Sequence, residues 1–392
     1  MRQFLFLAFL GLSFFLTAQQ ADSWRAYTDF LESEIAEGQI AGAVSLVVRN
    51  GKTLHKGAWG KSDIATGAPM TEDRVFHIMS MTKPIVSVAA MQLWEQGKFQ
   101  LDDPVSKYLD GFDGLRVATD VRQGKDQETV PAASPVTIRQ VFSHTAGFSH
   151  GLSGSALDND VARALYFAPQ ADIASRVKTL TELPLIGQPG KQWSYSASPD
   201  VLALLVEKLS GMTMDDYLRK NVFKPLRMND TGYNMTEEQA ARMPKLYKIV
   251  DGKLQQDKMQ MPANGHSVFG GSHGLLSTVA DYSRFCQMLL NGGKLKGKRI
   301  LKASTIELMG ESHIGDAPYA PGQTFGLGFG VTTATPEDDL DSKGRMFWSG
   351  AYSTFFFVDP ANDLYAILMT QTSPYTGKYG EAMRKYVYEG MK

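Results

Sequence analysis

Apolar residues recur with two different periods along the chain, and the two periods predict a mixed α and β fold. Residues 24–37 have apolar side chains at helical spacing. Residues 43–48 form a valine-rich run typical of a strand, and Asn50-Gly51 after it favours a two-residue hairpin turn. Residues 52–59 fit the returning strand. The mature chain is therefore expected to begin with a helix, a strand, a turn and a second strand.

The middle of the chain is mostly helical in pattern, with turn signals between short segments. Strand-like residues return at 245–250, and Gly270-Gly271-Ser272-His273-Gly274 is typical of a flexible, hinge-like loop. Helices are expected at 137–143, 160–166, 172–181, 199–209, 214–222 and 279–290.

The last third of the chain returns to strand patterns before a final amphipathic helix at 378–391. Strands at both ends and helices between them predict an α/β (α+β) fold, in which an antiparallel sheet from both chain ends is flanked by helices and a mostly helical second domain is inserted. We place the α/β domain at 22–101 and 266–392 and the helical domain at 102–265. A cleft is expected where they meet. The late strands are expected at 325–331, 346–348, 351–358 and 364–370.

The composition of the chain limits the kinds of molecule that it is expected to bind. The chain has 392 residues, of which 43% are hydrophobic and 21% charged, and its formal net charge is −1. No long basic run is present, so neither nucleic acid nor an acidic membrane is an expected partner. The single cysteine, Cys286, excludes an internal disulfide or a cysteine-based metal cluster, and we expect it to be an inert core residue.

The first residues have the pattern of a secretory signal. Arg2 precedes an almost wholly apolar run at 4–16, and small residues at 17–21 offer a cleavage site. The run is short for a membrane span, so residues 1–21 are predicted to be a cleaved signal peptide and not an integral anchor. This predicts a periplasmic or secreted protein.

Ser80 and Lys83 form a Ser-x-x-Lys motif just before a predicted helix at 85–96. If that helix begins near Ser80, the two side chains lie on one face, with Cβ atoms roughly 5–6 Å apart. A lysine can take the serine proton only if burial or a neighbour lowers its pKa from roughly 10.4. The serine N–H, free in the first helical turn, can point at an oxyanion. A motif with only two fixed positions also occurs by chance, so other residues must support a catalytic role for Ser80 and Lys83.

Three other stretches of the sequence bear on a catalytic role for this motif. Tyr195, within residues 193–196, can exchange a proton with a serine, and a neighbouring ammonium would lower its pKa. A backbone N–H within residues 348–351 can be a second oxyanion donor. His144 is not expected to be the base, because a helix-ending turn explains it as well. A buried tyrosine and a core tryptophan are the structural alternatives for the first two.

Together these residues resemble the serine β-lactamase and penicillin-binding-protein superfamily, and most closely the class C β-lactamase-like carboxylesterases known as family VIII esterases. Ser80-Met81-Thr82-Lys83 matches the nucleophile motif. Tyr195-Ser196-Ala197 falls where the family has Tyr-x-Asn or Tyr-Ser-x. Trp348-Ser349-Gly350 falls where the β-lactamases have Lys-Thr-Gly and the esterases commonly Trp-Gly-Gly. The resemblance covers nearly the whole mature chain in the correct order, and further typical segments are 141–148, 274–278 and 326–330.

The resemblance implies an acyl-enzyme mechanism without a cofactor or a metal. In such a mechanism Ser80 attacks the acyl carbon, and Lys83 and Tyr195 share the acid–base work. The backbone N–H groups of Ser80 and Ala351 form the oxyanion hole, and water releases the acyl group. The sequence leaves open which of Lys83 and Tyr195 is the base. The expected pocket residues are Trp348, Ser349 and Gly350.

Three departures from the family pattern bear on the substrate. Ala197 replaces the asparagine that holds the substrate amide in β-lactamases, and Trp348 replaces the lysine that helps to bind the β-lactam carboxylate. Each lost contact is worth about 1–3 kcal/mol. Both losses argue against efficient penicillin hydrolysis and favour a neutral acyl substrate. The sequence is therefore interpreted as that of a serine hydrolase acting on short-chain acyl esters. Ser349, in place of the usual esterase glycine, is expected to narrow the pocket.

Two alternatives stay open: a β-lactamase, D-amino-acid peptidase or amidase of the same superfamily, and an inert cell-wall-binding relative. Ser267 is rejected as an α/β-hydrolase nucleophile because the segment 265–269 lacks the second glycine of that motif. His266 and His273 do not form a zinc-binding pair on a helix. The oligomeric state cannot be predicted from the sequence.

Overall fold

The computed structural model describes residues 23–333 and 342–391. The predicted signal peptide, residues 1–21, lies outside the described residues. Within the two described ranges, no helix combines the length and the apolar character needed to cross a bilayer.

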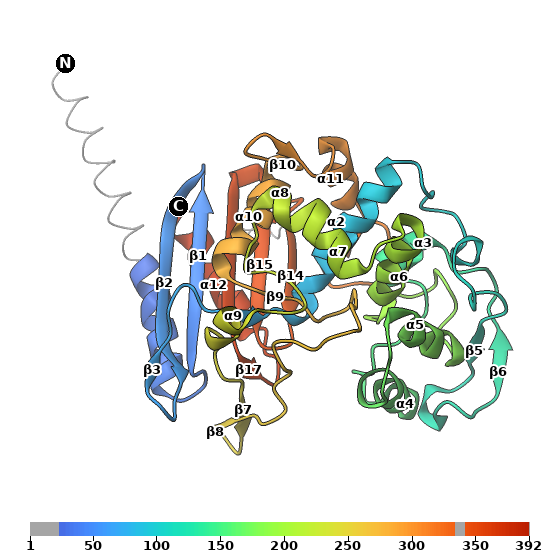
Figure 1. Cartoon of the computed structure of the whole chain (residues 1–392), viewed down its shortest axis with the longest axis horizontal. Coiled ribbons are helices and arrows are strands. Elements are labelled where there is room, and N and C mark those ends of the chain that lie inside the picture. The colour runs from blue at the N-terminus through green and yellow to red at the C-terminus, as the bar shows by residue number, and fades with distance from the viewer. Residues whose placement is uncertain (1–22, 334–341, 392) are drawn as a thin grey trace.

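Strands from the two ends of the chain form one antiparallel sheet. Among the described residues it has eight strands, in the order β12-β13-β14-β15-β16-β1-β2-β3. β1 (Gly42–Arg49) pairs with β2 (Lys52–Asp63) on one side and with β16 (Leu364–Thr370) on the other (Figure 1). The predicted antiparallel sheet from both chain ends is therefore confirmed. The other strands are β3 (Ala68–Pro69), β12 (Gln323–Phe325), β13 (Gly330–Thr332), β14 (Met346–Gly350) and β15 (Thr354–Asp359).

The turn between β1 and β2 has the backbone that the sequence predicts. Asn50 and Gly51 have φ angles of 51° and 68°. A type I′ turn requires positive φ at both central residues, and Asn-Gly tolerates this better than other pairs. Arg49 then pairs with Lys52 directly across the turn.

Helices cover both faces of the sheet, which explains why β1 is apolar throughout. Val44 belongs to the core on the side of α10 (Val279–Leu290). Val47 packs on the other side, in a cluster with the helix at 23–36 and α12 (Lys378–Glu389). Successive side chains of a strand point to opposite faces, so a strand buried on both faces needs a continuous apolar run.

Residues 105–223 lie beside the sheet and carry most of the remaining helices, whereas residues 224–226 lie against α10, which covers the sheet (Figure 1). The middle of the chain also carries two hairpins, one of which joins the C-terminal part through β17 (Thr372–Ser373), a parallel partner of β7. The boundaries of the helical domain at 102 and 265 stay a prediction. The helices are α3 (Ile138–Phe142), α4 (Ala156–Ala162), η4 (Arg163–Phe167), α5 (Ile173–Glu182), α6 (Ser198–Ser210), α7 (Met214–Leu218), η5 (Arg219–Phe223), α8 (Lys224–Leu226) and α9 (Glu237–Ala241). The hairpins are β5 (Arg116–Ala118) with β6 (Thr129–Pro131), and β7 (Tyr247–Val250) with β8 (Lys253–Gln256).

Short elements complete the connections between these layers. The short strands are β4 (Phe76–His77) with β9 (Leu276–Ser277), and β10 (Lys294–Leu295) with β11 (Lys298–Arg299). The helices and helical turns are η1 (Met79–Met81), α2 (Thr82–Glu95), η2 (Val105–Lys107), η3 (Val121–Gln123), α11 (Ala303–Met309) and η6 (Pro360–Asn362).

Two local expectations are wrong. Residues 325–331 are not one strand, because Gly328 has a φ of 93° and the chain turns there, so that β13 pairs back on β12. The loop at 270–274 is not a hinge, since Ser272 is fully buried within it. At Gly271 a Cβ would overlap the carbonyl oxygen of Pro199. The glycines there allow a close approach to α6, not motion.

Candidate active site

The N-terminal end of α2 presents Ser80 to the space between the two parts of the molecule. The chain leaves β4, turns at Met79 with a φ of 48°, and enters the helical turn η1 before α2 begins at Thr82. A methionine in left-handed backbone is strained, and such strain is concentrated at functional sites. Ser80 is partly exposed, whereas the α2 residues from Thr82 to Met91 are buried.

The structure brings together the three residues that the sequence predicts to be catalytic. The Nζ atom of Lys83 is 3.1 Å from the Oγ atom of Ser80. The hydroxyl of Tyr195, in the loop before α6, donates to the same Oγ atom at 2.6 Å. The Lys83 Nζ atom also lies 4.6 Å from the centroid of the Tyr195 ring.

Lys83 is held in a buried polar pocket. Its Nζ atom donates to the carbonyl of Ser272 at 2.7 Å, and the N–H of Ser272 donates to Asp200 Oδ1 at 2.7 Å. Arg176 approaches the other oxygen of Asp200 at 3.7 Å. Only 1% of Lys83 is exposed, and burial lowers its pKa to about 7, although the carboxylate of Asp200 opposes part of this change. A substantial fraction of the Lys83 side chains is therefore neutral near pH 7.

Tyr195 responds to the same environment in the opposite direction. Burial raises its pKa, and the hydrogen bond with Ser80 offsets only part of that rise. The expectation that the charge of Lys83 would lower the pKa of Tyr195 is wrong. The burial that disfavours the phenolate also disfavours the ammonium, so the charge that would stabilise a phenolate is itself reduced.

The glycine of the Trp-Ser-Gly motif lets β14 approach the Ser80 segment. A Cβ on Gly350 would overlap both the carbonyl oxygen of Ile78 and the hydroxyl of Thr354. Ala351 is an exposed residue of the turn directly after β14. The pairing of its N–H with that of Ser80 in an oxyanion hole stays a prediction.

The side chains of β14 alternate between the two faces of the sheet. The ring of Trp348 lies 5.5 Å from that of Tyr195 and 5.1 Å from that of Phe325, so it faces the candidate site. Ser349 pairs with Phe355, whose ring contacts Gly380 of α12 on the opposite face. The side chain of Ser349 therefore points away from the Trp348 face, and it does not narrow the space in front of Ser80.

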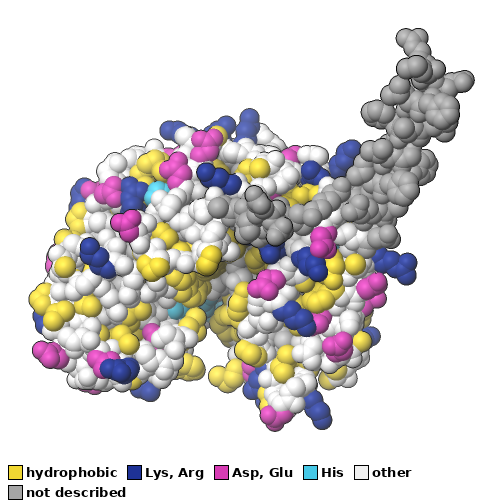
Figure 2. Space-filling view, turned by 180° about the vertical axis from the view of Figure 1, so that it is seen from behind, with side chains coloured by type: hydrophobic (Ala, Val, Ile, Leu, Met, Phe, Trp, Pro, Cys, Tyr) yellow, Lys and Arg dark blue, Asp and Glu magenta, His cyan; other side chains and the backbone are white. Residues whose placement is uncertain are grey.

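Further aromatic side chains lie around Tyr195. Trp193 and Tyr195 stack with their centroids 6.4 Å apart, and Tyr319 contacts Trp193 edge-on at 4.7 Å. None of these groups carries a charge. Figure 2 shows a cleft between the two parts of the molecule, with hydrophobic side chains along its walls and histidine inside it.

His144 lies near the site but does not contact Ser80. Its backbone has a φ of 57° immediately after α3, as expected of a helix-ending turn. Its Nδ1 atom lies 2.8 Å from Ser196 Oγ and accepts the N–H of Ser196 at 3.2 Å. His144 therefore supports the backbone next to Tyr195 and is not the base.

A second buried histidine, His150, lies at the site and was not predicted from the sequence. His150 Nε2 lies 3.4 Å from Lys83 Nζ, and its Nδ1 lies 2.9 Å from the hydroxyl of Tyr166. Its ring stacks on that of Tyr195, with centroids 4.9 Å apart and planes 19° apart. The only signal in the sequence was the position of His150 shortly after the family-like segment 141–148.

The rejected candidates lie apart from Ser80 or are inert. Ser267 is exposed, and His266 pairs with the carbonyl of Pro262 at 2.8 Å. Cys286 is fully buried in α10, and burial raises the pKa of its thiol well above the usual value.

The comparisons with known proteins agree with this arrangement. A family model described as "Beta-lactamase" matches residues 27–387, which is nearly the whole described chain. The protein belongs to the beta-lactamase family. The resemblance found from the Ser80, Tyr195 and Trp348 motifs is confirmed, and so is the β-lactamase/transpeptidase-like fold.

Relatives within the beta-lactamase family include esterases. Protein Rv1367c of Mycobacterium tuberculosis is 32% identical over 352 residues, which cover 86% of this chain and 87% of the relative. Esterase EstB of Burkholderia gladioli is 28% identical over 91% of this chain and 93% of its own length. The structure of EstCE1, described as a hydrolase with promiscuous acyltransferase activity, superposes with a TM-score of 0.80 at 24% identity, over 95% of this chain and 99% of EstCE1.

Proposed function

We propose that the protein is an exported serine hydrolase that cleaves short-chain acyl esters through an acyl-enzyme on Ser80. One observation carries this proposal. Ser80 Oγ lies between Lys83 Nζ at 3.1 Å and the Tyr195 hydroxyl at 2.6 Å, so a base and an acid both contact the nucleophile. The export part rests on the signal pattern of residues 1–21 alone.

The pKa directions of Lys83 and Tyr195 support one division of the two roles that the sequence left open. Lys83, with a pKa of about 7, is available as a neutral amine and takes the Ser80 proton as Oγ bonds to the acyl carbon. Tyr195 keeps its proton and donates it to the leaving alkoxide when the ester C–O bond breaks. The Lys83 ammonium then returns a proton to the Tyr195 phenolate, so that the net effect moves one proton from Ser80 to the alcohol and leaves both groups in their starting forms. Water then attacks the acyl-enzyme by the reverse sequence.

The surroundings of Ser80 favour a neutral acyl group. Trp348 offers an apolar ring where β-lactamases have a lysine, and it packs against other aromatic rings. Ala197 is fully buried and offers no amide to a substrate. A carboxylate would lose hydration here without gaining a cation, which is costly. Esters without charge on the acyl side avoid that cost. The relative EstB, which is named an esterase, supports an ester as the substrate.

The decisive experiment compares esters with a β-lactam on the mature protein. Initial rates are measured for p-nitrophenyl acetate, butyrate and octanoate beside a chromogenic cephalosporin, with Ser80→Ala as the control. We expect ester turnover that disappears in Ser80→Ala, and little cephalosporin cleavage. Faster cephalosporin turnover would favour a β-lactamase. A wild-type protein that turns over neither substrate and is not labelled by a serine-reactive probe would favour the inert cell-wall-binding alternative.

A further inference from the structure

The contacts of His150 suggest that it takes part in proton transfer at Ser80. This inference rests on the proposed function. His150 follows α3, and its side chain lies between Lys83, Tyr166 and the ring of Tyr195. Tyr166 belongs to η4, a π-helical turn that continues α4. Such turns are rare and are frequent at functional sites.

The hydrogen bonds of Lys83 define what His150 must do. A neutral amine has two N–H donors and one lone pair. One N–H is used by the Ser272 carbonyl at 2.7 Å. The other N–H and the lone pair must then divide between Ser80 and His150. Proton transfer from Ser80 requires the lone pair to face Ser80, so the second N–H must point at His150.

We propose that His150 is a positioning residue for Lys83, whose Nε2 accepts an amine N–H and thereby turns the lone pair toward Ser80. This requires the tautomer with hydrogen on Nδ1, which can donate to the Tyr166 oxygen at 2.9 Å. The same tautomer suits the ammonium formed later, because its three N–H groups then face Ser272, His150 and the Ser80–Tyr195 pair. A hydrogen on Nε2 would oppose both states.

The charged groups around Lys83 are consistent with a neutral His150. Burial lowers the pKa of His150 well below its usual value, and the nearby Lys83 lowers it further. His144 is buried and His273 is half-buried, and both have lowered pKa values, so neither adds a cation. The remaining charges that face Lys83 are the Asp200 carboxylate and its partner Arg176.

Three proteins test this role: wild type, His150→Leu and His150→Gln. Leucine removes the acceptor, whereas the side-chain carbonyl of glutamine can reach the position of Nε2. For ester hydrolysis we expect His150→Leu to lower kcat at least tenfold, with KM within threefold of wild type. In this variant the Lys83 ammonium loses a hydrogen-bond acceptor, so the pKa of Lys83 should fall. The decrease of kcat/KM on the acid side of its pH profile, the acid limb, should therefore move to lower pH. His150→Gln should recover at least half of the lost kcat on a logarithmic scale.

The outcomes separate this inference from the proposed function. Equal losses in both variants, or an unchanged acid limb in His150→Leu, would mean that His150 only fills space, and would overturn the inference. Ser80→Ala runs in the same assay. If Ser80→Ala keeps its activity, the proposed function fails. If it is inactive while His150→Leu behaves as wild type, only the role of His150 fails.

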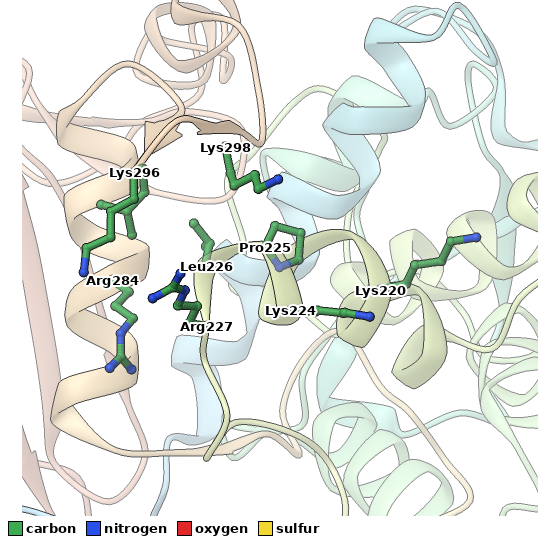
Figure 3. A pocket seen from close by; sticks show the side chains of 9 residues that line it. Lys220, Lys224, Pro225, Leu226, Arg227, Arg284, Lys296 and Lys298 are labelled. Carbon is green, nitrogen blue, oxygen red and sulfur yellow. The ribbon is translucent and has the colours of Figure 1, made fainter.

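A different observation points to an anion site on the outer surface. A hollow of about 350 Å³ lies between η5, α8, α10 and the β10–β11 hairpin (Figure 3). Six cations line it: Lys220, Lys224, Arg227, Arg284, Lys296 and Lys298. Arg284 forms an ion pair with Asp281, whereas the other five have no acidic partner among the described residues.

The hollow combines this charge with apolar walls. Pro225 and Leu226 lie between the cations, and Leu226 is buried. Grouped like charges repel one another, and low-dielectric walls focus their field. The whole chain carries a net charge of only −1, so the cations gather here against an otherwise balanced composition. We infer that the hollow binds a multivalent oxyanion of the oligophosphate or phosphate-ester class.

Inorganic tripolyphosphate is the probe for this site. Calorimetric titration should give one site per chain whose affinity falls as salt is raised. The triple variant Lys224→Glu, Arg227→Glu, Lys298→Glu should weaken binding at least tenfold. The control triple variant Lys61→Glu, Lys191→Glu, Lys385→Glu changes three exposed lysines outside the hollow. It should weaken tripolyphosphate binding less than twofold. Absence of binding by wild type, or equal weakening in both triple variants, would overturn the inference. Thermal melting checks that both variants are folded.

Discussion

Replacing Asp200 by asparagine should shift the pH dependence of ester hydrolysis without removing the hydrogen bond that Asp200 makes. The carboxylate accepts the Ser272 N–H, and asparagine can still do so. The change removes the negative charge that raises the pKa of Lys83. The ammonium is then less stable, the pKa falls below about 7, and Lys83 stays neutral to lower pH. The acid limb of kcat/KM should therefore move to lower pH.

The size of the shift follows from the charges around Lys83. One residue, Ser272, separates the ammonium from the carboxylate, so the charges are roughly 7 Å apart and interact by roughly 2 kcal/mol at an effective dielectric of about 20. That interaction equals about 1.5 pH units. Arg176 beside Asp200 offsets part of it, so we expect a shift of about one unit. Because Lys83 has a pKa of about 7, kcat/KM in wild type should fall about 50-fold between pH 7 and pH 5.

The assay is the pH profile of kcat/KM for p-nitrophenyl acetate, which reports groups of the free enzyme. Asp281→Asn is the matched control, because Asp281 is also a buried carboxylate but lies on α10. In Asp281→Asn the acid limb of kcat/KM should stay at the wild-type pH. A limb that does not move in Asp200→Asn, or that moves to higher pH, would refute the assignment of Lys83 as the group that must be neutral.

Three further changes test the geometry of the site and its support. Gly350→Ala should lower kcat/KM about 100-fold, because a Cβ would displace β14 from Ile78; Gly377→Ala, where a Cβ meets only a flexible side-chain end at 3.3 Å, should have little effect. Tyr195→Phe should lower kcat by roughly 10²–10⁴-fold, and a loss below about threefold would exclude its hydroxyl from proton transfer. Gly271→Ala should lower the free energy of unfolding by about 1–3 kcal/mol in urea denaturation, whereas an unchanged midpoint would show that the 270–274 loop can move aside.

The sequence predicted the elements whose signals are local. The Asn50-Gly51 turn depends on two adjacent residues, and α10 was predicted with its observed bounds of Val279–Leu290. The hairpin within 325–331 was missed because alternating glycine and bulky residues mimic a strand. The packed loop at 270–274 was mistaken for a hinge. A glycine needed for close approach and a glycine needed for motion have the same sequence signal.

In the candidate site, too, contacts between residues close in sequence could be predicted, and most contacts between distant residues could not. Ser80 and Lys83 lie one helical turn apart, so their spacing predicts their contact. Tyr195 was proposed from the chemistry of a phenol beside a lysine, and the family motif supported its place near Ser80. His150 and Asp200 were not predicted, because they reach Lys83 across 67 residues and through the backbone of Ser272, respectively. The cations of the outer hollow were missed for a related reason: a search for basic runs cannot detect side chains that three separate segments bring together.

The environment of Ser80 explains why one pocket can supply both a base and an acid near neutral pH. Burial penalises whichever form of a group is charged. For Lys83 the charged form holds the proton, so burial releases it and leaves a base with a pKa of about 7. For Tyr195 the charged form lacks the proton, so burial retains it and leaves an acid. The proposed mechanism therefore needs no separate device for each partner, because burial in one pocket favours both proposed roles, and Ser80 lies within hydrogen-bond distance of Lys83 and of Tyr195.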